Sequence, residues 1–244
     1  MSVGDADRRE VVQAPAKLTV SLRIVGRRSD GYHLLDSEMV SIDLVDELTF
    51  TDGDGLEVVG GPVTLPRGDD NLVRRALRAV GRTAQVRLVN RIPPGGGLGG
   101  GSADAAAVLR WAGVVDDVGL ALSLGADVPF CVRGGRARVR ETGERIDPLP
   151  HADRMFTLTT PPFPCSTAEV YKVWDELGGP TPAGPNDLEP AALVVEPRLV
   201  QWRDRLGEAT GQTPFLAGSG STWWVEGAFP GDDRVVVRTL PEHK

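Results

Sequence analysis

The stretch with the clearest chemical potential is a run of six glycines in the seven positions 95–101, with Leu98 at its centre. Glycine leaves backbone N–H groups unobstructed and permits positive φ angles. The run lies between an apolar strand-like segment, 84–92, and an Ala-rich helical segment, 103–112. It therefore meets a helix N-terminus, with unpaired N–H donors and a partial positive charge. Such a loop binds anions, and the sequence predicts a site for a nucleotide or another phosphorylated ligand.

Three other interpretations of the glycine run fit less well. A flexible linker is rich in Gly and Ser and polar over a longer length, whereas regular elements are predicted directly on both sides here. No Gly-Lys-Ser/Thr follows, so the run is not a Walker loop. It matches Gly-x-Gly-x-x-Gly at Gly95, Gly97 and Gly100, but a dinucleotide fold needs a longer second strand than residues 114–115 before Asp116.

Two charged residues stand out because their neighbours are apolar. Lys17 is the lone cation of the segment 14–18, and a lysine buried there without an anionic partner would be costly. Asp127 lies between Leu-Gly-Ala and Val-Pro-Phe. Taken alone, these residues leave open a solvated lysine on a strand and an aspartate that caps a helix or a turn.

Composition narrows the class of protein. A chain of 244 residues with 41% hydrophobic and 25% charged residues is typical of a globular protein of one large or two modest domains. The net charge of −7 argues against a general nucleic-acid binder. Cys131 and Cys165 lack metal-ligand spacing and are expected to be buried thiols in a reducing compartment. No apolar run suits a membrane span or a signal peptide, so we expect a cytoplasmic protein without membrane contact.

Periodicity and turn residues predict the elements that position these groups. In the first half we expect strands over 16–25, 38–44, 47–51 and 85–89, and helices over 71–80 and 103–112. Ser102 is placed to cap the second of these helices. In the second half we expect a hairpin over 136–140 and 145–150, helices over 168–177 and 196–210, and a strand over 222–226 after a glycine turn, 217–221. This mixture predicts an α+β protein with a boundary near 150–155.

Seven segments follow one another in an order that resembles the GHMP kinase superfamily. They are Ala14–Leu18, Gly26–His33, Asp70–Val73, Pro93–Ala106, Leu124–Phe130, Asn186–Glu189 and Gly218–Gly220. The resemblance covers about residues 13–226. Within the superfamily, the segments 27–33 and 124–129 are most similar to the kinases that phosphorylate a cytidine-diphosphate-linked methylerythritol in non-mevalonate isoprenoid biosynthesis.

The resemblance implies the two-domain GHMP kinase fold, an α+β architecture. A ribosomal-protein-S5-like α/β domain over 1–152 would carry the phosphate loop and the catalytic residues, and a ferredoxin-like domain over 153–244 would follow. The implied reaction transfers the ATP γ-phosphate to the 2-hydroxyl of the cytidylated alcohol, with Mg²⁺ carried by the nucleotide. The implied partners are small molecules alone, with no nucleic acid, and the chain would be a monomer or weak homodimer.

The resemblance also implies a role for each matching residue. Lys17 would stabilise the alkoxide and the phosphoryl group and pair with Asp127, which would be the general base. Substrate would contact Thr19, Tyr32, His33, Thr167 and Tyr171, with the Tyr32–His33 pair meeting the cytosine ring. The glycine turn Gly218, Ser219 and Gly220 would close over the phosphates, and no metal ligand is assigned among the protein's side chains. ATP would contact Asn71, Pro93, Pro94, Gly95, Gly96, Gly97, Leu98, Gly99, Gly100, Gly101, Ser102 and Ala103.

Three departures from the family pattern leave these roles in place. Thr19 stands where the family usually has Asn, the stretch between Asp104 and Asp127 is short, and the chain has little beyond one strand after Glu226. Two alternatives stay open: another GHMP small-molecule kinase, and a non-catalytic nucleotide-binding relative. The Tyr32–His33 pair argues against the first, and the presence of both Lys17 and Asp127 argues against the second.

Overall fold

A computed structural model describes residues 9–61 and 68–243. The first sheet has six strands in the order β3-β4-β2-β5-β6, with β1 paired to β2 beside this path. All its neighbours are antiparallel except β3 and β4, which are parallel. The strands are β1 (Glu10–Arg27), β2 (His33–Thr51), β3 (Gly55–Val59), β4 (Gln85–Val89), β5 (Arg136–Glu141) and β6 (Arg145–Pro148).

The β1–β2 pair is longer than the sequence predicts. The strand expected over 16–25 is part of β1, and the strands expected over 38–44 and 47–51 are one continuous strand, β2. The predicted break was wrong because Asp46, which interrupts the apolar pattern, is buried with its carboxylate accepting hydrogen bonds from Arg91 and Ile92 N–H groups. A satisfied buried carboxylate allows the strand to continue.

Four helices cover the first sheet. They are α1 (Leu72–Ala79), α2 (Gly100–Ala112), α3 (Val118–Leu124) and α4 (Val128–Arg133). Helices α2 and α4 contact its strands, and α1 and α3 pack against these two helices. The helix predicted over 103–112 is confirmed as the central, buried helix α2, because small alanines let it approach both β1 and α4. Helices α3 and α4 are too short to give a periodic signal. Pro129 lies in the first turn of α4, where a missing N–H is tolerated.

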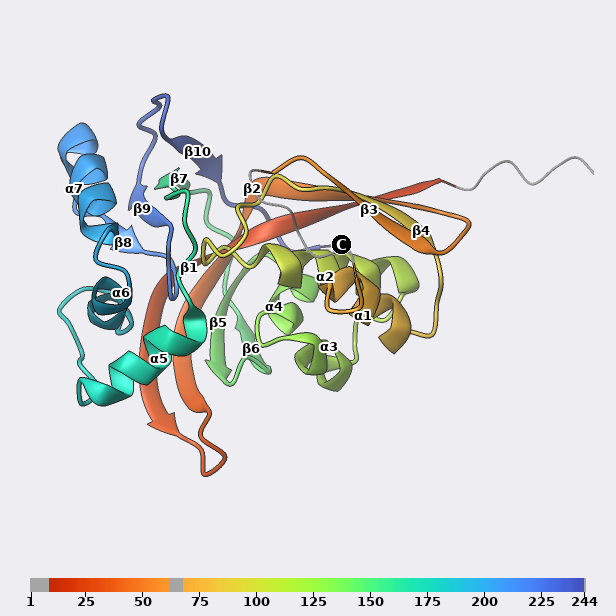
Figure 1. Ribbon diagram of the computed structural model, residues 1–244, viewed down its shortest axis with the longest axis horizontal. Helices are drawn as coiled ribbons and strands as arrows, with labels where there is room; N and C mark the ends of the chain where they lie inside the picture. Colours follow the sequence, from red (N-terminus) through yellow and green to blue (C-terminus); the bar gives the residue numbers. More distant parts are fainter. Residues whose placement is uncertain (1–8, 62–67, 244) are drawn as a thin grey trace, which may run out of the picture.

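A second sheet, in the order β10-β7-β9-β8, follows in the chain. Its strands are β7 (Met155–Thr159), β8 (Phe215–Leu216), β9 (Trp223–Glu226) and β10 (Val235–Arg238), and its helices are α5 (Thr167–Glu176), α6 (Glu189–Val195) and α7 (Leu199–Thr210). The helices predicted over 168–177 and 196–210 and the strand over 222–226 are confirmed as α5, α7 and β9. Figure 1 shows α1–α4 and α5–α7 as two separate groups, with the long β1–β2 pair passing between them.

The two parts are joined by shared packing. The apolar cluster between the first sheet and its helices extends to Phe156, Leu158 and Trp224 of the second sheet. Both cysteines are buried and free, as expected, and burial raises the pKa of Cys131 to about 12 and that of Cys165 to about 11. Across residues 9–61 and 68–243, no helix has the length and apolar character needed to cross a bilayer.

Candidate active site

A cavity of about 490 Å³ is lined by both parts of the molecule. Strands β1 and β2 supply one wall, the glycine loop and the start of α2 supply another, and α5 with the glycine turn supplies the third. Among the residues predicted from the sequence, the lining includes Lys17, Thr19, Asn71, Pro93, Pro94, Gly95, Gly96, Gly97, Gly99, Gly100, Gly101, Ser102, Asp127, Thr167, Tyr171, Gly218 and Ser219. The fold thus gathers residues that are up to two hundred positions apart.

The glycine loop is held against its surroundings by its carbonyl groups. The Leu98 carbonyl accepts from Lys17 N–H at 3.0 Å, and the Gly96 carbonyl accepts from Thr222 N–H at 3.1 Å. Gly97 and Gly99 have φ angles of +77° and +70°, which favour glycine. A Cβ at Gly97 would also overlap the Ala217 carbonyl oxygen, so the loop and the glycine turn can approach this closely only without a side chain.

Lys17 and Asp127 meet in the lining of the cavity. The Lys17 side chain is 7% exposed, and its Nζ lies 3.4 Å from Asp127 Oδ2 and donates to Thr19 Oγ1 at 3.1 Å. Asp127 immediately precedes α4, makes no capping hydrogen bond with its side chain, and is 30% exposed. The helix-cap alternative for Asp127 is therefore excluded, as is the solvated-strand alternative for Lys17. The pair places an ammonium and a carboxylate beside the glycine loop.

The glycine turn is fixed by side chains from the second part of the molecule. Asn186, which is 3% exposed, donates from Nδ2 to the Leu216 and Gly218 carbonyl groups at 2.9 and 2.7 Å. Thr167 Oγ1 and Ser219 Oγ lie 2.8 Å apart, so α5 is tied to the turn beside the cavity. Gly220, which is outside the lining, packs near Cys165 and Leu216.

An aromatic group lies at the α5 side of the cavity. The His33 ring stacks on Tyr171 with centroids 4.9 Å apart and meets Trp174 edge-on at 5.5 Å. Asp175 Oδ1 lies 2.8 Å from His33 Nε2 and orients the imidazole. Burial raises the pKa of the Tyr171 hydroxyl. His33 therefore reaches the cavity wall through Tyr171, while Tyr32 is 66% exposed at the tip of the β1–β2 hairpin, which excludes core packing for that ring.

The remaining predicted residues lie as follows. Leu98 and Ala103 are each 1% exposed and belong to the core beneath the loop. The prediction that Ser102 caps the helix was wrong: α2 begins at Gly100, and its N-cap is Gly99 in the left-handed conformation without a side-chain hydrogen bond. The left-handed glycine starts the helix earlier, so Ser102 lies within its first turn and lines the cavity. Asn71 caps α1, accepting from Val73 N–H at 2.8 Å.

Sequence reasoning did not single out part of the lining. Leu22, Leu35 and Met39 are apolar strand residues that no pattern distinguishes from core residues. Asn90 and Asp104 are buried polar residues of the same lining, 4% and 3% exposed. A polar residue at the end of the strand that leads to the glycine run and an aspartate inside an alanine-rich helix were the available signals for these two.

Comparisons with known proteins agree with this arrangement. A family model for the GHMP kinases N terminal domain matches residues 71–135. The chain is 36% identical over 239 residues to the 4-diphosphocytidyl-2-C-methyl-D-erythritol kinase of Cereibacter sphaeroides, covering 86% of each chain. It is 37% identical over 236 residues to the enzyme of the same name from Paracoccus denitrificans, covering 88% of this chain and 85% of the relative.

Solved structures show the same fold. A crystal structure of 4-(cytidine 5'-diphospho)-2C-methyl-D-erythritol kinase superposes with a TM-score of 0.74 at 30% identity, covering 94% of this chain and 99% of the other. A homoserine kinase from Cytophaga hutchinsonii superposes with a TM-score of 0.64 at 17% identity, covering 99% and 98%. The two-domain α+β GHMP kinase fold expected from the sequence is confirmed.

Proposed function

The chain belongs to the 4-diphosphocytidyl-2-C-methyl-D-erythritol kinases of the GHMP kinase superfamily, and we propose that its cavity transfers the γ-phosphoryl group of ATP to the 2-hydroxyl of that cytidylated alcohol. The product would serve non-mevalonate isoprenoid biosynthesis. Phosphoryl transfer needs in-line positioning and neutralisation of charge more than covalent chemistry. The cavity offers an anion-binding loop, a lysine and a carboxylate for these tasks.

The observation that carries the proposal is the Lys17–Asp127 pair, 3.4 Å apart and facing the glycine loop. Asp127 would accept the proton of the substrate hydroxyl as its oxygen bonds to the γ-phosphorus. The bond between that phosphorus and the β,γ-bridging oxygen breaks, and ADP leaves with the electron pair. Lys17 would stabilise the negative charge on the attacking oxygen and on the transferring group.

ATP would place its phosphates along the glycine loop and its adenosine toward Asn71. Because the loop carbonyls of Gly96 and Leu98 are engaged with Thr222 and Lys17, we expect the loop amides to face the phosphates. Mg²⁺ would enter this cavity as a companion of the nucleotide, with the phosphates along the glycine loop. When bound, it would neutralise phosphate charge, with phosphate oxygens as its main ligands.

The cytidine group would bind at the His33–Tyr171 stack. A flat pyrimidine is matched by an aromatic wall, and the Asp175 carboxylate beside His33 Nε2 holds the imidazole in one orientation. Thr19 of β1 and Thr167 of α5 supply hydroxyl groups from two walls of the same cavity. Tyr32, the neighbour of His33 at the hairpin tip, has an exposed ring that would contact the bound base from there.

The boundary between residues 152 and 153, the cytoplasmic location and the monomer or weak homodimer are predictions from the sequence. The first falls in the segment between β6 and β7, where the chain passes from the first sheet to the second. Limited proteolysis of this segment tests the domain boundary. Sedimentation of the purified chain in the analytical ultracentrifuge tests whether it is a monomer or a weak homodimer.

The deciding experiment measures ADP release with ATP, Mg²⁺ and the cytidylated methylerythritol, in parallel with mevalonate, phosphomevalonate, homoserine and galactose. We expect turnover with the cytidylated alcohol alone. Turnover with another alcohol would support the kinase reaction but contradict a cytidine site at His33 and Tyr171. ATP binding without turnover of any alcohol would favour the non-catalytic relative and contradict the roles of Lys17 and Asp127.

A further inference from the structure

Three buried polar side chains meet beneath the glycine loop. Asp46 of β2 is 0% exposed, Asp104 of α2 is 3% exposed, and Asn90, directly after β4, is 4% exposed. They come from helix α2 and from the paired strands β2 and β4, and the Lys17–Asp127 pair does not involve them. Buried polar groups are costly unless they are hydrogen-bonded, so their partners define what the cluster does.

Asp46 holds the chain as it enters the loop. Its Oδ1 accepts from the backbone N–H groups of Arg91 and Ile92 at 2.5 and 2.8 Å, and its Oδ2 accepts from Asn90 Nδ2 at 3.1 Å. Asn90 Nδ2 also donates to the Ile92 carbonyl at 3.1 Å. Burial raises the pKa of Asp46, and its three N–H donors oppose that rise by stabilising the ionised form. Asp46 therefore fixes residues 90–92, immediately before the loop at 93–101.

Asp104 lies at the other end of the loop, in the second turn of α2. Asp46 Oδ2 lies 3.8 Å from the position that a Cβ would take at Gly100, one helical turn before Asp104, so the Asp46 carboxylate faces the side of α2 that carries Asp104. In the described part of the chain, Asp104 Oδ1 is buried and receives no N–H or O–H donor. Burial and the neighbouring Asp46 charge raise the pKa of Asp104 well above its usual value. A protonated Asp104 satisfies this geometry, because two ionised carboxylates in contact repel each other.

None of the other charged and titratable groups that we find around Asp104 in the described residues contradicts a protonated Asp104. Asp46 faces it from β2, with Arg91 beside Asp46. The Cys131 thiol faces it from α4 and is kept neutral by burial. Lys17 of β1 packs against Gly99, but its ammonium is turned to Asp127 and Thr19. The α1 arginines contact Asp54, Asp69 and the Ser123 carbonyl instead.

We propose that neutral Asp104 donates a hydrogen bond to ionised Asp46 and so joins the two ends of the glycine loop, fixing the loop for the phosphates of ATP. Asp104 is then a positioning residue, which acts on the nucleotide through Asp46 and the loop backbone. This inference rests on the proposed function for the identity of the nucleotide. Its readout is nucleotide binding, which needs no acceptor alcohol.

The test compares Asp104→Ala, which removes the donor, with Asp104→Asn, whose amide N–H can replace it. We expect Asp104→Ala to raise the KM for ATP and the Kd for ADP about tenfold, equivalent to about 1.4 kcal/mol. The KM for the cytidylated alcohol should change less than about twofold. Asp104→Asn should restore nucleotide affinity to within about threefold of the wild type, since it preserves both shape and donor.

A matched control separates positioning from general stability. Val139→Ala truncates a side chain that is 1% exposed in β5, on the first sheet but away from the cavity. It should lower Tm without changing the Kd for ADP. If Asp104→Ala changed only Tm, as Val139→Ala does, or if Asp104→Asn were as weak as Asp104→Ala, the proposal would be wrong.

A spectroscopic measurement on the intact protein covers the case in which Asp104→Ala does not fold. Infrared difference spectra of wild type against Asp104→Asn should contain the carbonyl stretch of a protonated carboxylic acid at neutral pH. Its absence would overturn the neutral donor. If the wild type did not turn over the cytidylated alcohol but Asp104→Ala still bound ADP more weakly, the proposed function would be wrong. The inference about Asp104 would then still hold.

Discussion

Lys17 is a buried cation whose charge is compensated by polar neighbours. Its ammonium lies 3.4 Å from Asp127 and 3.1 Å from Thr19 Oγ1, with the glycine loop packed against its aliphatic stem. The sequence indicated Lys17 and Asp127 separately, because each interrupts an apolar segment. Their contact could not be derived from local pattern, since 110 positions separate them and α4, which positions Asp127, is too short to be predicted.

Replacing Asp127 by Asn should remove the proton acceptor while keeping the shape of the side chain. We expect kcat to fall by at least about 100-fold, the usual scale for a general base, with the Kd for ATP unchanged within about twofold. Single-turnover kinetics and calorimetry measure the two quantities. Asp116→Asn, which removes the same charge from an exposed loop, is the control. Equal loss of ATP binding in Asp127→Asn would contradict the role given to this carboxylate.

Removing the Tyr171 ring should weaken binding of the cytidylated alcohol. If base stacking contributes about 1–3 kcal/mol, Tyr171→Ala raises the KM for that substrate about 5- to 150-fold. The KM for ATP should not change. Tyr171→Phe keeps the ring beside His33, so its KM for the cytidylated alcohol should remain near that of the wild type. Tyr32→Ala tests whether the exposed ring at the hairpin tip contributes to the same KM. An unaltered KM in Tyr171→Ala would place the cytosine elsewhere.

At the scale of elements, the glycine loop was predictable because composition alone specifies its backbone. The run predicts positive φ angles and a helix start, and both are present, although α2 starts at Gly100 rather than after Ser102. The close approach of this loop to the glycine turn at 217–220 was not predictable. It depends on how the second sheet folds back, which a local sequence pattern does not report.

Gly97→Ala should separate the effect of this approach from that of the φ angle. The new Cβ would overlap the Ala217 carbonyl and lie 2.8 Å from the Gly220 carbonyl oxygen. Gly113 has a similar φ of +74° but nothing within 4 Å of a Cβ, so Gly113→Ala is a matched control. We expect about 1 kcal/mol of destabilisation for the control and about 2–4 kcal/mol for Gly97→Ala.

Denaturant unfolding gives these stabilities, and ADP titration gives the functional consequence. Only Gly97→Ala should weaken ADP binding, because only this change pushes the phosphate loop away from the glycine turn. Equal destabilisation by the two alanines, with equal ADP affinity, would show that the contact between loop and turn contributes nothing beyond the backbone angle.

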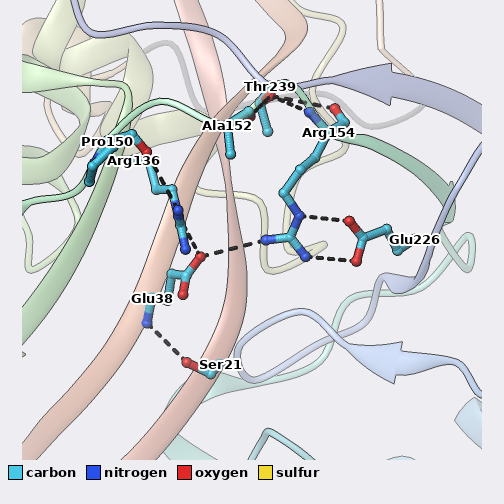
Figure 2. Close-up of polar contacts among 8 residues, drawn as sticks. All are labelled: Ser21, Glu38, Arg136, Pro150, Ala152, Arg154, Glu226 and Thr239. Atoms are coloured by element: carbon cyan, nitrogen blue, oxygen red, sulfur yellow. Dashed lines mark hydrogen bonds and ion pairs between the residues drawn. The ribbon is translucent and has the colours of Figure 1, made fainter.

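At the scale of the whole molecule, the site exists only because two sheets keep a fixed relation. The cavity has walls from both, and the polar network of Figure 2 spans their junction. Arg154 lies 3.5 Å from Glu38 of the first sheet and donates two hydrogen bonds, of 2.8 and 2.9 Å, to Glu226 of the second. The Thr239 hydroxyl fastens the same segment, accepting from Arg154 N–H and donating to the Ala152 carbonyl. Sequence pattern predicted a boundary near this segment but not the arginine that bridges it.

Arg154→Ala should therefore affect stability and both substrates together. The Arg154 side chain is 21% exposed and also covers the Phe156 ring, so its removal should cost about 1–3 kcal/mol of unfolding free energy. Because the cavity walls would lose a common tie, the KM values for ATP and for the alcohol should rise in parallel. Arg138→Ala breaks a more exposed ion pair with Asp36 inside the first sheet and should cost less than about 1 kcal/mol. Comparable losses in the two variants, or a rise in only one KM in Arg154→Ala, would mean that the junction is held by its apolar packing instead.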